Sequence, residues 1–181
     1  MERCRMVFSG SGGQGVVTAA IILAEAAVLY EDLTAVQSQS YGPEARGGAT
    51  RSDVIIWDTE IFFPKVIEPN VLVCLTQEAY NRFYSIIRPG GLLITDTRYV
   101  KVQSKVDAQQ KELPLYQSVM EKIGKPIVFN ICMLGAVVGL TKVVKPESVM
   151  SVLKDRIPKN FLTINRQALE LGLSMAESVN I

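Results

Sequence analysis

The sequence predicts an α/β fold: a Rossmann-like, mostly parallel sheet flanked by helices, with a helical C-terminal part. Two observations predict it. Short runs rich in Val, Ile and Leu alternate with helical patterns, which is typical of βαβ units. These runs are apolar almost throughout, as strands covered on both faces are. The chain has 181 residues and neither a linker nor an internal repeat, so we expect a single domain over residues 1–181.

The expected elements alternate in the first half of the chain and are mainly helical in the second. Strands are expected at Cys4–Phe8, Thr34–Gln37, Arg51–Trp57, Val71–Leu75 and Leu92–Thr95, and helices between them at Val16–Tyr30 and Gln77–Ile87. The polar segment Lys101–Glu112 predicts a ribbon or an ordered loop. Further helices are expected at Leu115–Ile123, Ile131–Val143, Glu147–Ile157 and Phe161–Val179, separated by glycine and proline signals. Asn130 is the expected N-cap of the second of these.

The composition argues against several classes of function. The 19 basic and 18 acidic residues nearly cancel, so no charge footprint for nucleic acid or an anionic membrane is present. The chain has no histidine, and Cys4, Cys74 and Cys132 lie far apart in apolar runs. We therefore expect buried free thiols, no metal site and no catalytic residue on this chain. No signal peptide precedes the first strand, and we expect a cytoplasmic protein.

A glycine-rich loop joins the first expected strand to the first expected helix. Gly10, Gly12 and Gly15 have G-x-G-x-x-G spacing, with Gly13 and Gln14 between them. The first glycine would permit a tight turn, the second a close approach of backbone or ligand, and the third close packing of helix and strand. The helix N-terminus beyond them favours an anion. The acidic residue that grips the ribose of a dinucleotide is missing, since residues 36–39 read Val-Gln-Ser-Gln.

A second loop follows the second expected strand and is the other candidate site. It contains Tyr41, Gly42, Pro43, Glu44, Ala45, Arg46, Gly47 and Gly48. At the carboxyl edge of an open α/β sheet, such a loop borders the ligand crevice, and an arginine between small residues suits a carboxylate or phosphate. A solvated Glu44–Arg46 pair in a surface loop is the alternative. Asp96 is expected in a turn with Asx hydrogen bonding, with capping or binding at the same sheet edge as the alternative. Asn165 is expected at the surface or at an interface.

These segments together resemble the gamma subunit of 2-oxoacid:ferredoxin oxidoreductases. The resemblance is carried by residues 10–15 (GSGGQG), 40–48 (SYGPEARGG), 77–80 (QEAY) and 88–91 (RPGG), and it extends from the first strand through Leu140. The pairing of the two glycine-rich loops at this interval is its most specific part. The Pro-Glu-Ala-Arg form favours the 2-oxoglutarate type over the pyruvate and ketoisovalerate relatives.

The resemblance implies a multi-subunit enzyme that oxidatively decarboxylates a 2-oxoacid. Thiamine diphosphate with Mg²⁺ and [4Fe–4S] clusters would be bound by the other subunits, coenzyme A would accept the acyl group, and ferredoxin the electrons. Partners would be alpha, beta and ferredoxin-like delta subunits, and this chain would contribute assembly and access for coenzyme A or substrate, with no activity alone. The two glycine-rich loops would contact either a ligand or a sister subunit. The alternatives are a stand-alone nucleotide-binding oxidoreductase and a non-catalytic Rossmann-like binding module.

Overall fold

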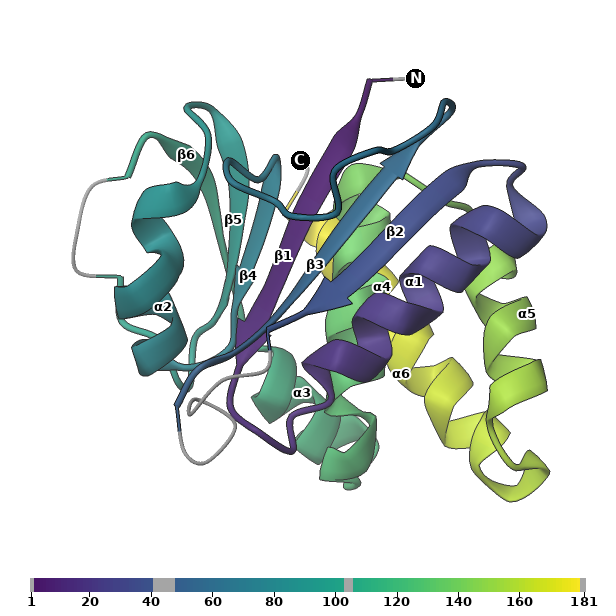
Figure 1. Cartoon of the computed structure of the whole chain (residues 1–181). Helices are drawn as coiled ribbons and strands as arrows, with labels where there is room; N and C mark the ends of the chain where they lie inside the picture. Colours follow the sequence, from purple (N-terminus) through teal and green to yellow (C-terminus); the bar gives the residue numbers. More distant parts are fainter. Residues whose placement is uncertain (1, 41–47, 103–105, 180–181) are drawn as a thin grey trace.

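A six-stranded sheet forms the centre of the molecule in a computed structural model, which describes residues 2–40, 48–102 and 106–179. The strands are β1 (Cys4–Gly10), β2 (Thr34–Gln39), β3 (Thr50–Trp57), β4 (Val71–Cys74), β5 (Gly91–Asp96) and β6 (Ala108–Leu113). Their order in the sheet is β2-β3-β1-β4-β5-β6, as Figure 1 shows. Strands β1, β4, β5 and β6 run parallel, whereas β3 is antiparallel to both of its neighbours.

Helices cover both faces of the sheet unequally. Helix α2 (Gln77–Phe83), which continues into the 3₁₀ turn η2 (Tyr84–Ile86), covers one face. The other face carries α1 (Val16–Tyr30) and the C-terminal helices α3 (Leu115–Lys122), α4 (Phe129–Thr141), α5 (Pro146–Arg156) and α6 (Lys159–Ser178), with a 3₁₀ turn η3 (Pro126–Val128) before α4. None of the helices that the structure describes is long and apolar enough to cross a membrane.

Successive strand residues alternate between two separate hydrophobic cores, because side chains along a strand point to opposite faces. In β1, Met6 and Phe8 belong to the larger core under α1 and α4, and Val7 belongs to the smaller core under α2. Strand β3 repeats this alternation with Val54 and Ile55. Because both faces are covered, the inner strands are largely apolar, with polar residues mainly in the first half of β3, and this is the pattern from which the fold was predicted.

Helices α4 and α6 cross at two glycines. A Cβ atom on Gly172 would lie 2.0 Å from the carbonyl oxygen of Cys132, and one on Gly135 would lie 2.3 Å from that of Leu169. Backbone therefore meets backbone at this crossing, and any side chain there would force the helices apart.

The predicted fold class is confirmed, and the observed elements differ from the expected ones at particular points. Lys101–Glu112 was expected to be a ribbon or a loop, but its second half is the edge strand β6, paired in parallel with β5. Asn130 is not an N-cap: α4 begins at Phe129, so Asn130 lies inside its first turn. The expected helix Gln77–Ile87 is an α-helix followed by a 3₁₀ turn. Asn165 is buried rather than at the surface.

Candidate functional site: the glycine loop and the adjoining pocket

The glycine loop lies at the carboxyl end of β1, and its glycines differ from one another in backbone conformation and in contacts. The residues with positive φ are Gly13, at 87°, and Gly15, at 73°, in the left-handed region that favours glycine. Gly15 is the N-cap residue of α1. A Cβ added to Gly12 would have no described atom within 4 Å, so the chain itself makes no close approach there.

Gln14 closes the loop on itself. Its side-chain oxygen accepts a hydrogen bond from the backbone N–H of Ser11 at 2.8 Å. A Cβ on Gly10 would lie 2.4 Å from that same oxygen, so a side chain at this position would displace the Gln14 amide from its place in the loop. A tight turn was expected at Gly10, and the turn that follows it is closed by the hydrogen bond between Ser11 and the Gln14 side chain.

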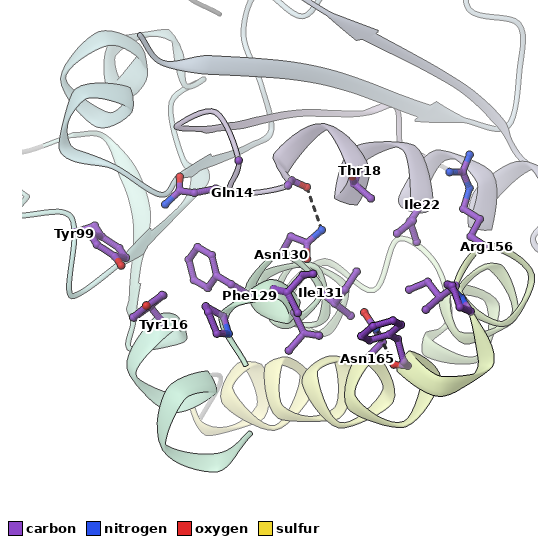
Figure 2. Close-up of a pocket in the computed structure, with 18 residues that line it drawn as sticks. Gln14, Thr18, Ile22, Tyr99, Tyr116, Phe129, Asn130, Ile131, Arg156 and Asn165 are labelled. Carbon is purple, nitrogen blue, oxygen red and sulfur yellow. Dashed lines mark hydrogen bonds between the residues drawn. The ribbon is translucent and has the colours of Figure 1, made fainter. Parts of the chain in front are cut away.

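Gly15 packs against α4 rather than against a strand. The Asn130 side chain donates from Nδ2 to the carbonyl oxygen of Gly15 at 3.3 Å (dashed line in Figure 2). A Cβ on Gly15 would lie 2.6 Å from Nδ2 and 3.0 Å from the Cβ of Asn130. This contact fixes the start of α1 to the first turn of α4, and no sequence pattern indicated it because 115 residues separate the two partners.

A pocket of about 590 Å³ opens beside the loop, between α1 and the C-terminal helices. Ligand pockets commonly span roughly 300–1,000 Å³. Its walls are mostly apolar and come from the glycine loop, the turn after β5, and helices α1, α3, η3, α4, α5 and α6 with the α5–α6 connection. The lining residues are Gly13, Gln14, Gly15, Thr18, Ile22, Tyr99, Tyr116, Pro126, Ile127, Val128, Phe129, Asn130, Ile131, Arg156, Ile157, Pro158, Phe161 and Asn165 (Figure 2). Ile127 is 73% exposed and Phe161 is 43% exposed, so large apolar groups border the opening.

Three aromatic rings form the end of the pocket beside Gln14. Tyr99 and Tyr116 meet edge to face, with ring centroids 5.3 Å apart, and Tyr116 meets Phe129 in the same way at 5.7 Å. The Arg98 guanidinium lies over both tyrosine rings, 5.8 Å and 5.1 Å from their centroids. Cation–π contacts of this kind hold an arginine in one place at an exposed site.

The opposite end of the pocket is polar (Figure 2). Arg156 forms an ion pair with Glu25 of α1 and so ties α5 to α1. Asn165 is 7% exposed and donates from Nδ2 to the carbonyl oxygen of Phe161 at 2.9 Å, back along its own helix. The pocket therefore joins an aromatic end, a glycine loop with a helix N-terminus, and a polar end.

The second predicted loop lies largely outside the described residues. Tyr41, Gly42, Pro43, Glu44, Arg46 and Gly47 fall in the segment 41–47, and Gly48 is described as half-buried in a bend. Its two ends are placed near the glycine loop, because Thr50 pairs with Gly10 and Ser40 donates to the carbonyl of Arg51. The residues on either side of the second loop, Ser40 and Thr50, therefore lie at the same edge of the sheet as the glycine loop.

The three cysteines are buried or half-buried and lie in separate parts of the fold. Burial raises the pKa of Cys74 and of Cys132 to about 12, and the two thiols belong to cores on opposite faces of the sheet. Burial raises the pKa of Cys4 to about 11. Over residues 2–40, 48–102 and 106–179, no three His, Cys, Asp or Glu side chains lie close enough to hold a metal ion.

The fold is a Rossmann-like α/β fold with a displaced second strand. In a dinucleotide-binding fold the second strand lies next to the first, which brings its carboxyl end near the glycine loop. Here β3 lies between β1 and β2, so the end of β2 is one strand further away. Gln37, in β2, uses its side-chain amide to bond Ser52 of β3 at 2.8 Å.

Comparison with known proteins identifies the family. The model of the pyruvate ferredoxin/flavodoxin oxidoreductase family matches residues 5–175, and the chain belongs to this family. It is 44% identical over 173 residues to the 2-oxoglutarate synthase subunit KorC of Methanocaldococcus jannaschii, covering 94% of this chain and 92% of the relative. It is 36% identical to the common gamma subunit of the pyruvate/ketoisovalerate oxidoreductases of Thermococcus litoralis, over 82% of this chain and 83% of that one.

A solved structure agrees with these relatives. The gamma subunit of a keto/oxoacid ferredoxin oxidoreductase from Geobacter sulfurreducens has a TM-score of 0.91 and 38% identity, with 98% of each chain covered. The resemblance to gamma subunits is thereby confirmed: the chain is a subunit of an oxidoreductase complex of this family.

Proposed function

We propose that this chain is the gamma subunit of a 2-oxoglutarate:ferredoxin oxidoreductase, a complex that also contains alpha, beta and ferredoxin-like delta subunits. The observation that carries the proposal is the 44% identity to a 2-oxoglutarate synthase subunit along nearly the whole chain, against 36% over a shorter stretch for a pyruvate/ketoisovalerate subunit. In this proposal ferredoxin accepts the electrons and coenzyme A the acyl group.

The chemistry of the reaction belongs to the other subunits in this proposal. Thiamine diphosphate with Mg²⁺ would supply decarboxylation, and [4Fe–4S] clusters would supply electron transfer. This chain does not fit a cluster, because Cys74 and Cys132 are buried on opposite faces of the sheet. It has no histidine to act as a base near neutral pH. The purified subunit should therefore show no turnover with 2-oxoglutarate, coenzyme A and a viologen dye, whereas the reconstituted complex should. Equal turnover by the lone subunit would refute its assignment as a non-catalytic subunit.

The pocket beside the glycine loop is the part of this chain that we assign to coenzyme A or substrate access. Its apolar walls suit an amphipathic ligand, and the start of α1 favours an anionic group, since its first turn, Val16-Val17-Thr18, carries no acidic residue. The site residues Gly10, Gly12, Gly13, Gln14 and Gly15 form one border of it or of an interface with a sister subunit. The segment with Arg46 would supply the other border.

A pair of matched substitutions tests the pocket. Thr18 is exposed on α1 and lines the pocket, whereas Thr163 is exposed on α6 and lies outside it. In the reconstituted complex, Thr18→Trp should raise the KM for coenzyme A about tenfold, a change of about 1.4 kcal/mol, with kcat at saturation retained. Thr163→Trp should leave both constants unchanged. Equal constants in the two variants, with both complexes assembled, would reject the pocket as the access site.

A dinucleotide-binding oxidoreductase is the competing function. The displaced position of β2 and the absence of an acid at its end both count against it. Calorimetric titration of the chain with NAD should detect no binding tighter than roughly millimolar, or about −4 kcal/mol. Micromolar affinity would favour this alternative.

A further inference from the structure

Asp96 is a carboxylate at the carboxyl end of β5 with no solvent exposure. Carboxylates are rarely buried so completely unless their oxygens find hydrogen-bond donors. Burial raises the pKa of this carboxyl, and the backbone N–H groups around it oppose that rise. From the sequence, a turn was expected at this position, with capping or binding as the alternative; Asp96 is the last residue of β5, and the turn follows at residues 97–99.

The two oxygens of Asp96 join two different segments of the chain. Oδ1 accepts the backbone N–H of Arg98 at 2.8 Å, within the turn after β5. Oδ2 accepts the backbone N–H of Tyr116 at 2.8 Å, in the first turn of α3. The N-cap residue of α3 is Pro114, whose side chain has no hydrogen-bonding atom, so Asp96 supplies from another element the acceptor that an N-cap normally provides.

Both segments carry the aromatic end of the pocket. Tyr99 lies in the turn that Oδ1 holds, and Tyr116 is the residue whose N–H binds Oδ2. Their rings meet edge to face at 5.3 Å, and both line the pocket beside Gln14 (Figure 2). The carboxylate thus sets the separation of the two backbones from which these rings project.

We propose that Asp96 is a positioning residue for the pocket. Its carboxylate holds Tyr99 and Tyr116 in the arrangement that a bound ligand would contact. The proposal rests on the proposed function for its ligand, coenzyme A, but the placement of the two rings can be measured without any ligand.

The test substitution is Asp96→Asn, with Asp53→Asn as its matched control. An Asn side chain has the shape of Asp, yet its NH₂ group faces an N–H donor, so one of the two amides loses its acceptor. Asp53 is 6% exposed and also accepts a backbone N–H, that of Val66 at 2.9 Å. It lies in β3 and pairs with Arg51, whose guanidinium stacks on Phe83 of α2, on the face opposite the pocket.

Two readouts separate positioning from general stability. In NMR spectra of the full chain, the ring resonances of Tyr99 and Tyr116, assigned with Tyr→Phe variants, should lose their ring-current shifts in Asp96→Asn and keep them in Asp53→Asn. In the reconstituted complex, Asp96→Asn should raise the KM for coenzyme A about three- to tenfold with kcat retained. Asp53→Asn should lower the melting temperature and leave KM unchanged.

Each outcome decides a separate statement. Unchanged ring shifts in Asp96→Asn would overturn the proposal, and so would an unchanged KM if Thr18→Trp raises it. If Thr18→Trp leaves KM unchanged, the assignment of coenzyme A to the pocket fails, and the ring shifts alone still decide whether Asp96 positions the tyrosines. Should Asp96→Asn fail to fold, acid titration of the wild-type chain replaces it. The Arg98 and Tyr116 amide resonances and the two tyrosine rings should then shift with one common midpoint, and separate midpoints would overturn the proposal.

Discussion

Replacing Gly172 by Ala should destabilise the protein although alanine is the better helix former. In the interior of α6 the exchange gains about 1 kcal/mol of helix propensity. A Cβ at this position, however, would lie 2.0 Å from the Cys132 carbonyl oxygen and 2.6 Å from the Ala136 nitrogen. Both are backbone atoms, so no rotamer change relieves the contact. Ordinary contact begins near 3.4 Å, and α4 and α6 would have to separate locally by more than 1 Å.

That separation opens the packing of side chains that are now fully buried, Cys132 and Leu169 among them. Overpacking a core costs typically about 1–3 kcal/mol and occasionally more, and at this backbone-to-backbone crossing we expect the upper end. After the propensity gain, the net loss should be about 2 kcal/mol, which lowers the melting temperature of a chain of this length by about 4–8 °C.

Urea unfolding followed by circular dichroism measures this loss directly, provided that the slope of the free energy of unfolding against urea concentration is the same in variant and wild type. Ser174→Ala, at an exposed position of the same helix, is the control and should stay within about 0.5 kcal/mol of wild type. A Gly172→Ala protein as stable as wild type would refute the conclusion that the two backbones touch.

Three further predictions concern the loop, one carboxylate and the thiols. Gly15→Ala should lower the free energy of unfolding by about 1–2 kcal/mol because of the left-handed backbone at this residue alone. Gly12→Ala should lower it by less than about 0.5 kcal/mol, because no described atom lies near a Cβ at that position. Equal urea midpoints for the two variants would contradict the different roles of the two glycines. A hydrogen bond from the Ser148 hydroxyl, in the first turn of α5, lowers the pKa of Glu31, so this contribution to stability is present at neutral pH and disappears as pH falls through the lowered pKa. In thermal unfolding, wild type should be about 1 kcal/mol more stable than Glu31→Gln at pH 7, and this difference should close as the pH falls below the usual range of a glutamate carboxyl. A difference that stays constant with pH would disprove it. With pKa values of about 12, Cys74 and Cys132 should not react with a disulfide reagent at about pH 8 until the protein unfolds, and rapid labelling of both in the folded chain would show that they are accessible.

Local patterns in the sequence predicted the elements of the fold well. The apolar runs and the glycine spacing depend on neighbouring residues, and the strands, helices and glycine loop lie close to where they were expected. The polar segment before α3 was harder, because β6 is an edge strand with charged residues such as Lys111 and Glu112, which natural sheet edges commonly carry. Its composition therefore resembles that of a loop.

The arrangement of the site depends on distant pairs that no local pattern records. The contact of Asn130 with Gly15, the acceptor that Asp96 offers to α3 and the insertion of β3 between β1 and β2 each join segments that are far apart or out of order in the chain. Asn130 looked like a cap because Asn commonly is one. Its actual partner could be identified only once the sheet had brought α1 and α4 together.

The glycine crossing of α4 and α6 also has a consequence for molecular recognition. Both helices contribute walls to the pocket, α4 through Phe129 and Asn130 and α6 through Phe161 and Asn165. Because the same helices are held together by backbone contact at Gly135 and Gly172, these walls cannot move apart independently of the core. A molecule that enters would meet a cavity whose shape exists before it arrives, so little conformational entropy would be lost on association. Selectivity for that molecule is then set by the packing of the protein interior, and variation at the two glycines would change which molecules fit.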